Sequence, residues 1–217
     1  MEVHTPEPME AKPSGHRFWD IVVSLTALII SGASMFTAYH TSHTMEKLVQ
    51  ANSWPFVQLD SGNVDNDSSE PALIFVVANA GTGPARVHSL VYQFDGQPVE
   101  GGFTWDRIAQ ACCAEARAAM IAGADGDMLT GYGVITTSSE GASVLAPGEE
   151  RIALNWPHTA LNHRLWTEMD QARRRGRITM RACFCSVFDE CWVTETNLFP
   201  PQPVDACEPG ATARQVH

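Results

Sequence analysis

The stretch ALIFVVANAG, residues 72–81, is a nearly continuous run of apolar residues that ends at a glycine. Such a run is typical of a β-strand that is buried on both faces. Further along, RVHSLVYQF (86–94) presents two alternating sets of side chains, and Asp95-Gly96 then supplies a turn. Shorter stretches with strand character occur at 55–60, 129–137, 144–145, 151–156, 177–188 and 191–195.

Two helices interrupt this strand pattern. The first, 104–122, has a repeat at every fourth position, formed by Ile108, Cys112, Ala116 and Met120. The second, 158–175, follows Pro157, ends before Gly176, and is expected to bury Leu161, Leu165, Met169 and Ala172. Many short strands with glycine and proline turns predict a mainly β fold, a β-sandwich with the two helices as insertions or crossovers on its surface.

Residues 18–40 predict a transmembrane helix. No charged residue occurs from Ile21 to Tyr39, and at about 1.5 Å per residue this stretch nearly crosses a hydrocarbon core of about 30 Å. Trp19 and Tyr39 stand at its ends, where interfacial aromatic residues are common. A cleaved signal peptide is the main alternative, but the preceding tail is long and acidic, which favours an uncleaved anchor in the lipid bilayer.

The charges that flank this helix predict its orientation. Lys12 and Arg17 precede it, whereas only Lys47 follows it within reach, so the N-terminus is expected in the cytoplasm and the C-terminal part in the periplasm. The expected organisation is a disordered cytoplasmic tail (1–17), the transmembrane helix (18–40), a helical stalk (41–53), an extracytoplasmic β-sandwich domain (54–207) and a second disordered tail (208–217).

Six cysteines offer a choice between metal ligands, a redox couple and disulfide bonds: Cys112, Cys113, Cys183, Cys185, Cys191 and Cys207. Their spacing does not give the paired knuckles of a zinc site, nor the Cys-x-x-Cys of a redox helix. We therefore expect disulfides, which an oxidising compartment would preserve. Cys185 and Cys191 could face each other across a hairpin, Cys183 could reach Cys112 or Cys113, and Cys207 could hold the tail. Six cysteines allow fifteen pairings, and the sequence does not choose among them.

The remaining polar motifs have structural explanations. Asn79, Gly81, Gly83 and Pro84 are expected to form a turn, because Pro84 and a following strand do not fit a phosphate-binding loop. Four arginines could form an anion-binding patch, although they also fit the end of a helix, where cations are favoured: Arg173, Arg174, Arg175 and Arg177.

The sequence does not predict a catalytic, metal or cofactor site. His158 and His163 stand five residues apart, which is the wrong spacing for two ligands on one face of a helix. A Ser-His-Asp set cannot be assembled with any specificity, and the chain has no Gly-x-Ser-x-Gly motif. No cofactor is expected.

The motifs NAGTGPARV (79–87) and CFCSVFDECW (183–192), together with Trp54-Pro55 after the anchor, carry a resemblance. The chain resembles a loose group of uncharacterised bacterial single-pass inner-membrane proteins. Members have an extracytoplasmic immunoglobulin-like domain, an Asn-x-Gly-x-Gly-Pro-Ala turn and a cysteine-rich C-terminal hairpin. The resemblance covers most of residues 18–207. It implies an immunoglobulin-like sandwich, and it implies no activity.

These observations lead to three hypotheses about function. The first is a membrane-anchored, non-enzymatic periplasmic module that binds another protein or envelope component. The second is an envelope thiol enzyme that uses a cysteine of the 183–191 hairpin, and the third is an accessory subunit of a larger membrane complex. The net charge of −11 argues against nucleic acid as a partner. A homodimer could form through small residues spaced by four in the span, Ala27 with Ser31 and Ser34 with Ala38.

Overall fold

A computed structural model of the chain describes residues 17–65, 68–99, 101, 103–138, 143–196 and 198–207. The chain separates into two compact units, Met1–Val49 and Gln50–His217. Apart from Arg17, the tails that the sequence predicts to be disordered lie outside the described residues.

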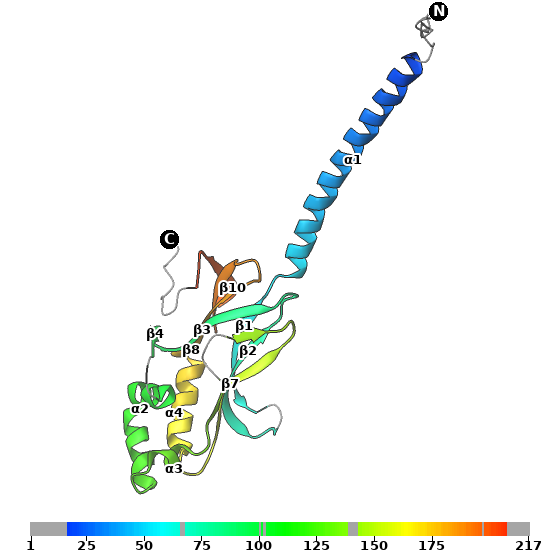
Figure 1. Ribbon diagram of the computed structural model, residues 1–217. Coiled ribbons are helices and arrows are strands. Elements are labelled where there is room, and N and C mark those ends of the chain that lie inside the picture. Colours follow the sequence, from blue (N-terminus) through cyan, green and yellow to red (C-terminus); the bar gives the residue numbers. More distant parts are fainter. Residues whose placement is uncertain are drawn as a thin grey trace, which may run out of the picture. The chain divides into compact units, whose positions relative to one another are not determined.

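The described part of the first unit lies in a single long helix, α1 (Arg17–Asn52) (Figure 1). Its segment Arg17–Gln50 has a stretch with a mean hydropathy of 2.0, and by length and composition it could cross a membrane or serve as a signal sequence. The predicted span (18–40) and all but the last residue of the predicted stalk (41–53) lie in this one helix. Hydroxyl groups of Ser24, Thr26 and Thr37 donate to backbone carbonyls one turn earlier, so these polar groups are satisfied inside the helix.

The first of two antiparallel sheets in the second unit has four strands. Its order is β1 (Val57–Val64), β2 (Pro71–Asn79), β7 (Glu150–Pro157) and β5 (Thr136–Thr137). In β2, Leu73 to Val77 are all buried, which confirms the prediction of a strand covered on both faces. The predicted strand at 129–137 is mostly wrong. Asp127 accepts a hydrogen bond from the Leu129 N–H at 3.0 Å and caps the short helix α3 (Met128–Tyr132) instead.

The second sheet has six strands. Its order is β10 (Leu198–Val204), β9 (Cys191–Glu195), β8 (Ile178–Cys185), β3 (Ala85–Phe94) and β4 (Gln97–Pro98), and β6 (Ser143–Leu145) also pairs with β3. Strands β8 and β9 form the predicted hairpin, in which Cys185 lies opposite Cys191. The two sheets face a common core, to which both contribute buried side chains.

The predicted helix α2 (Thr104–Gly123) forms, but it is broken in the middle. Cys113 has φ −146° and ψ 45°, which are not helical values. Eleven residues of straight helix would hold Asp106 and Arg117 about 16 Å apart along the axis. Their side chains nevertheless form an ion pair with Nε–Oδ1 of 2.6 Å, because the break turns the second half of α2 back toward the first. The four-residue repeat from which the helix was predicted did not indicate this break.

The second long helix of this unit, α4 (His163–Arg174), begins five residues later than predicted. Residues 158–162 form a loop instead, and Leu161 is 47% exposed rather than part of the buried stripe. The reason is Asn162, whose buried side chain accepts from the Thr159 N–H and donates to the carbonyl oxygens of Pro157 and Tyr132. Gly176, with φ +70°, ends the helix as expected.

Helices α2 and α4 contribute buried side chains to the core and do not lie only on its surface. Trp105 of α2 makes edge-to-face contacts with Phe75 of β2, Tyr92 of β3 and Trp156 of β7. Leu165 and Met169 of α4 are fully buried, and α2 and α4 lie side by side (Figure 1). The expectation of surface insertions was therefore wrong, and the unit is a mixed α/β structure of two antiparallel sheets with helices.

Candidate functional site

The predicted turn after β2 is organised by Asn79, which is 1% exposed. Its Oδ1 accepts hydrogen bonds from the N–H groups of Phe56 and Gly81, both at 3.1 Å. Its Nδ2 lies 2.8 Å from the carbonyl oxygen of Gly83 and 3.2 Å from that of Leu145. One side chain thus joins the start of β1, the turn itself and the end of β6.

The glycines of this turn permit a close approach between backbones. A Cβ atom at Gly81 would overlap the backbone of Trp54 and Phe56, and one at Gly83 would overlap the backbone of Ser53. Neither glycine has the positive φ that some turns require. These residues therefore allow residues 53–56 to lie directly against the turn, and they position the start of β1.

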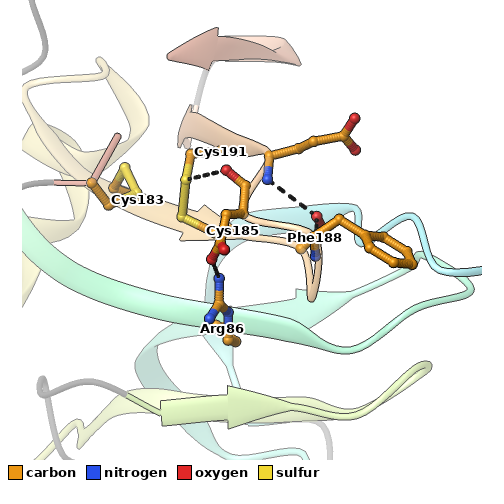
Figure 2. The surroundings of a disulfide bond; sticks show 9 residues. Arg86, Cys183, Cys185, Phe188 and Cys191 are labelled. Carbon is orange, nitrogen blue, oxygen red and sulfur yellow. Dashed lines mark hydrogen bonds and ion pairs between the residues drawn. A yellow bond between two sulfur atoms is a disulfide. The ribbon is translucent and has the colours of Figure 1, made fainter. Parts of the chain in front are cut away.

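The six cysteines lie in three pairs at disulfide distance. Cys185 pairs with Cys191 across the β8–β9 hairpin, and Figure 2 shows this bridge together with Arg86 of β3. Cys183 pairs with Cys207, with Cα atoms 5.7 Å apart, so it does not reach the cysteines of α2. The last pair, Cys112 and Cys113, is formed by neighbours in sequence at the break in α2. Of the pairings considered from sequence, the hairpin bridge and the attachment of Cys207 are present.

Two of these bridges lie close together. The sulfur atoms of Cys185, Cys191 and Cys207 are all within 4.8 Å of one another. As thiolates they would be suited to a soft metal ion. If the Cys183–Cys207 bridge were reduced, the Cys207 thiolate would be close enough to attack the Cys185–Cys191 disulfide, form a mixed disulfide and release the other cysteine of that bridge as a thiolate. The hairpin turn beside them is held by Ser186, whose Oγ accepts from the N–H of Phe188 at 3.1 Å.

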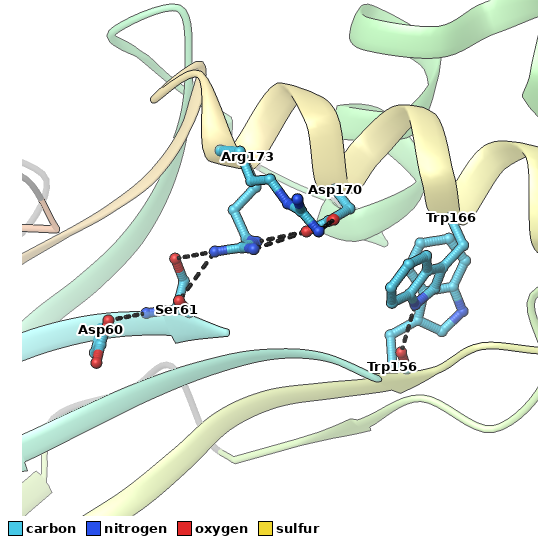
Figure 3. A network of polar contacts seen from close by, with 7 residues as sticks. Asp60, Ser61, Trp156, Trp166, Asp170 and Arg173 are labelled. Carbon is cyan, nitrogen blue, oxygen red and sulfur yellow. Dashed lines mark hydrogen bonds and ion pairs between the residues drawn. The ribbon is translucent and has the colours of Figure 1, made fainter. Parts of the chain in front are cut away.

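The four arginines that could bind an anion are largely occupied by acidic partners. Asp170 of α4, which is 4% exposed, forms ion pairs with Arg173 and Arg174, each with an N–O distance of 2.7 Å. Figure 3 shows Arg173 also reaching across to β1, where its Nη1 donates to the Ser61 carbonyl oxygen at 2.9 Å. Arg173 therefore connects α4 to an edge of the first sheet.

The remaining arginines of this group differ in environment. Arg177 pairs with Asp95 at 2.7 Å and lies over the ring of Phe94, and its hydrogen bond lowers the pKa of the Asp95 carboxyl. Arg175 is exposed, and within the described part of the chain it is the one arginine of the four without an acidic partner. The group therefore has less net positive charge than its sequence indicates.

A polar group that the sequence did not single out lies beside the break in α2. The buried Tyr132 donates its hydroxyl proton to Asp106 at 2.9 Å, and Asp106 also holds Arg117. Burial, together with the bond to Asp106, raises the pKa of Tyr132. The hydroxyl therefore stays protonated, and this group fixes α3 against α2 rather than offering a base or nucleophile.

A groove of about 340 Å³ runs along β1. One wall is formed by the consecutive residues 56–60. The other consists of Thr194, Glu195, Thr196, Leu198, Phe199 and Pro201. Phe199 is 75% exposed and contacts Phe56, which in turn contacts Trp54, itself 51% exposed. An exposed aromatic surface thus borders one end of the groove.

The groove gives access to the free backbone edge of β1. This strand pairs only with β2 in the described part of the chain. The Ala80 N–H donates to the Phe56 carbonyl at 2.8 Å, so the backbone groups of Phe56 point toward β2. Because these directions alternate along an antiparallel strand, Val57 and Leu59 direct their N–H and C=O groups away from β2. The Ser61 carbonyl, next in this alternation, accepts from Arg173 on that side.

Comparison with known protein families, curated proteins and solved structures gives no match for this chain. Its function is therefore inferred from the chemistry of the described residues. Sequence reasoning missed the groove, because these residues carry no motif and Phe56 meets Leu198 and Phe199 only in the folded chain. The aromatic residue Phe199 at the start of the proline-rich stretch FPPQP (199–203) was the signal that the sequence offered.

Proposed function

We propose that the protein is a membrane-anchored, non-enzymatic interaction module, with its N-terminus in the cytoplasm and its folded domain in the periplasm. The apolar helix α1 supports the anchor, since it is long enough to span a bilayer. Six cysteines in pairs at disulfide distance support an oxidising compartment for the domain. In this topology residues 18–40 contact lipid, and 54–207 form the extracytoplasmic domain.

We further propose that the domain belongs with the immunoglobulin-like sandwiches of the bacterial membrane proteins it resembles. Two antiparallel sheets with a shared core support this assignment. The Asn79 turn and the cysteine-rich hairpin also correspond to the features that carry the resemblance. The helices that enter the core would then be an elaboration particular to this chain.

The free edge of β1 is the observation that carries the proposed binding function. Unpaired strand edges bind extended peptides by adding a strand, with main-chain hydrogen bonds for affinity and side-chain pockets for specificity. Val57 and Leu59 offer the main-chain groups, and Phe56 and Phe199 offer apolar contact. Asp60 and Glu195 add negative charge to the lining. The fitting partner is thus an extended protein segment with apolar and basic side chains.

Photo-crosslinking in intact cells tests this proposal. A crosslinking amino acid at position 199 should give a discrete protein adduct, whereas one at Leu129, exposed by 69% on α3, should not. Asp60→Lys should reduce the adduct, because it repels a basic segment, while Glu115→Lys on α2 should leave it unchanged. An adduct of equal yield from both positions, or one indifferent to Asp60→Lys, would refute binding at this edge.

Two alternative functions, a thiol enzyme and an accessory subunit, predict different experimental results. A thiol enzyme is favoured by the closeness of the Cys207 sulfur to the Cys185–Cys191 bridge, and it requires a thiol that is free in part of the population. Alkylation of native membranes before reduction, followed by mass spectrometry, counts such thiols directly. An accessory subunit acting through α1 would instead co-purify with its complex in mild detergent after the groove is altered.

A further inference from the structure

The loop between β7 and α4 brings two histidines together. Nε2 of His158 and Nδ1 of His163 lie 2.8 Å apart, and the ring planes are nearly perpendicular, at 84°. The sequence spacing was unfavourable for a shared helical face, but His158 is not on the helix. It lies in the loop, while His163 is the first residue of α4. The loop therefore brings the two imidazole rings together, which a spacing of five residues on one helix would not do.

The backbone around this histidine pair is firmly held. The N–H of His158 donates to the Pro71 carbonyl of β2 at 2.9 Å. Asn162, which is 0% exposed, accepts from the Thr159 N–H at 2.7 Å and donates to the Pro157 carbonyl at 3.0 Å. The His158 ring also packs edge-on against Trp166, at 5.2 Å. The backbone at both histidines is thus held in place before any metal ion binds.

We propose that His158 and His163 form a binding site for a divalent transition-metal ion of tetragonal preference, above all Cu²⁺. Metal–imidazole bonds are about 2.0–2.1 Å long, so nitrogens at this separation would enclose an angle of about 85–90° at a shared ion. Such an angle suits the square-planar or tetragonal coordination of Cu²⁺ and Ni²⁺. A tetrahedral Zn²⁺ ion would need the nitrogens about 3.3 Å apart.

The surroundings of the pair are consistent with an open site. His163 is exposed, so its ring can turn to direct Nδ1 toward an ion, and solvent can fill the remaining coordination positions. Among the described residues, no third histidine, cysteine or carboxylate completes a cluster here. The alternative role is an N–H···N hydrogen bond between two neutral rings, which the same distance permits. The two roles differ in one measurable property, the affinity for copper.

Copper titration of the full chain in mild detergent tests the site. All samples carry His40→Gln and His43→Gln, because these two residues form another closely spaced histidine pair on α1. Cu²⁺ bound at the loop should quench Trp166, and the electron paramagnetic resonance spectrum at one equivalent should show a tetragonal ion with two imidazole nitrogens. The spectrum reports on the parent protein without relying on any loop variant.

Variants assign the ligands. His158→Gln and His163→Gln should each weaken copper binding by at least about tenfold, since loss of a direct ligand should cost no less than loss of a group that supports one. His88→Gln, which alters an exposed histidine of β3, should change nothing. Unchanged copper affinity in both loop variants, or a parent spectrum without two imidazole nitrogens, would overturn the proposal. Crosslinking at position 199 does not depend on this result, so the two proposals can fail separately.

Discussion

Replacement of Asn79 by alanine should strongly destabilise the domain, because one buried side chain serves three segments. The substitution leaves the N–H groups of Phe56 and Gly81 without their acceptor. It also leaves the carbonyls of Gly83 and Leu145 without their donor. At about 1 kcal/mol of net stability for each of these four bonds, the loss approaches 4 kcal/mol. Water that reaches the partly buried N–H groups would offset some of it, so we expect about 3–4 kcal/mol.

Urea unfolding of the full chain in mild detergent, followed by near-ultraviolet circular dichroism, measures this loss. Asn155→Ala is a matched control, since among the described residues the Asn155 side chain makes one hydrogen bond, from Nδ2 to Asp65 at 2.9 Å, and its loss should cost about 1 kcal/mol. Asn79→Asp keeps the acceptor but turns a carboxylate toward backbone carbonyls, so it should be no more stable than Asn79→Ala at neutral pH. A loss below about 1 kcal/mol for Asn79→Ala would refute the view of Asn79 as the organiser of this turn.

Three further predictions concern the core, a bridge and the turn. The pKa of Tyr132 is raised above its ordinary value of 10.0, so above pH 10 the folded chain holds a proton that the unfolded chain releases. The unfolding free energy should therefore fall by up to about 1.4 kcal/mol for each pH unit above pH 10. Tyr132→Phe should remove this contribution, which unfolding curves at alkaline pH measure. The pair Cys183→Ser with Cys207→Ser opens a loop with a sequence separation of 24 and should lower the unfolding free energy by about 3–4 kcal/mol, measured by urea titration without reductant. Gly83→Ala should cost more than about 2 kcal/mol in the same titration, because its Cβ would overlap the Ser53 backbone, whereas Gly123→Ala, with open space around its Cβ, should be neutral within about 1 kcal/mol.

Local patterns predicted the elements whose neighbours in sequence determine them. The apolar run at 72–81 gave β2, and the cysteine-bearing hairpin formed as β8 and β9. Gly176 ended α4 because a positive φ at that position suits glycine. The uncharged stretch from Ile21 to Tyr39 lies in a helix that could span a membrane. In each case the deciding interactions lie within one strand, one turn or one helix.

Predictions failed where a polar cap or a distant contact, neither of which the apolar pattern records, decided the local structure. The strand expected at 129–137 gave way to α3, where the Asp127 cap and the burial of Tyr132 against Trp156 favour a helical turn. The expected start of α4 moved to His163, because Asn162 binds the carbonyl oxygen of Tyr132, 30 residues away in sequence. Apolar periodicity contains no information about such partners.

By itself the sequence determined an apolar N-terminal helix, a series of antiparallel strands and the supply of cysteines, because hydrophobic pattern and turn chemistry act over a few residues. Only the tertiary structure decided which cysteines meet, which arginines are paired and which edge of β1 stays open. It also brought His158 to His163 through a loop that Asn162 holds. These features depend on the packing of segments that are remote in sequence, and that packing is set by the shared core around Trp105.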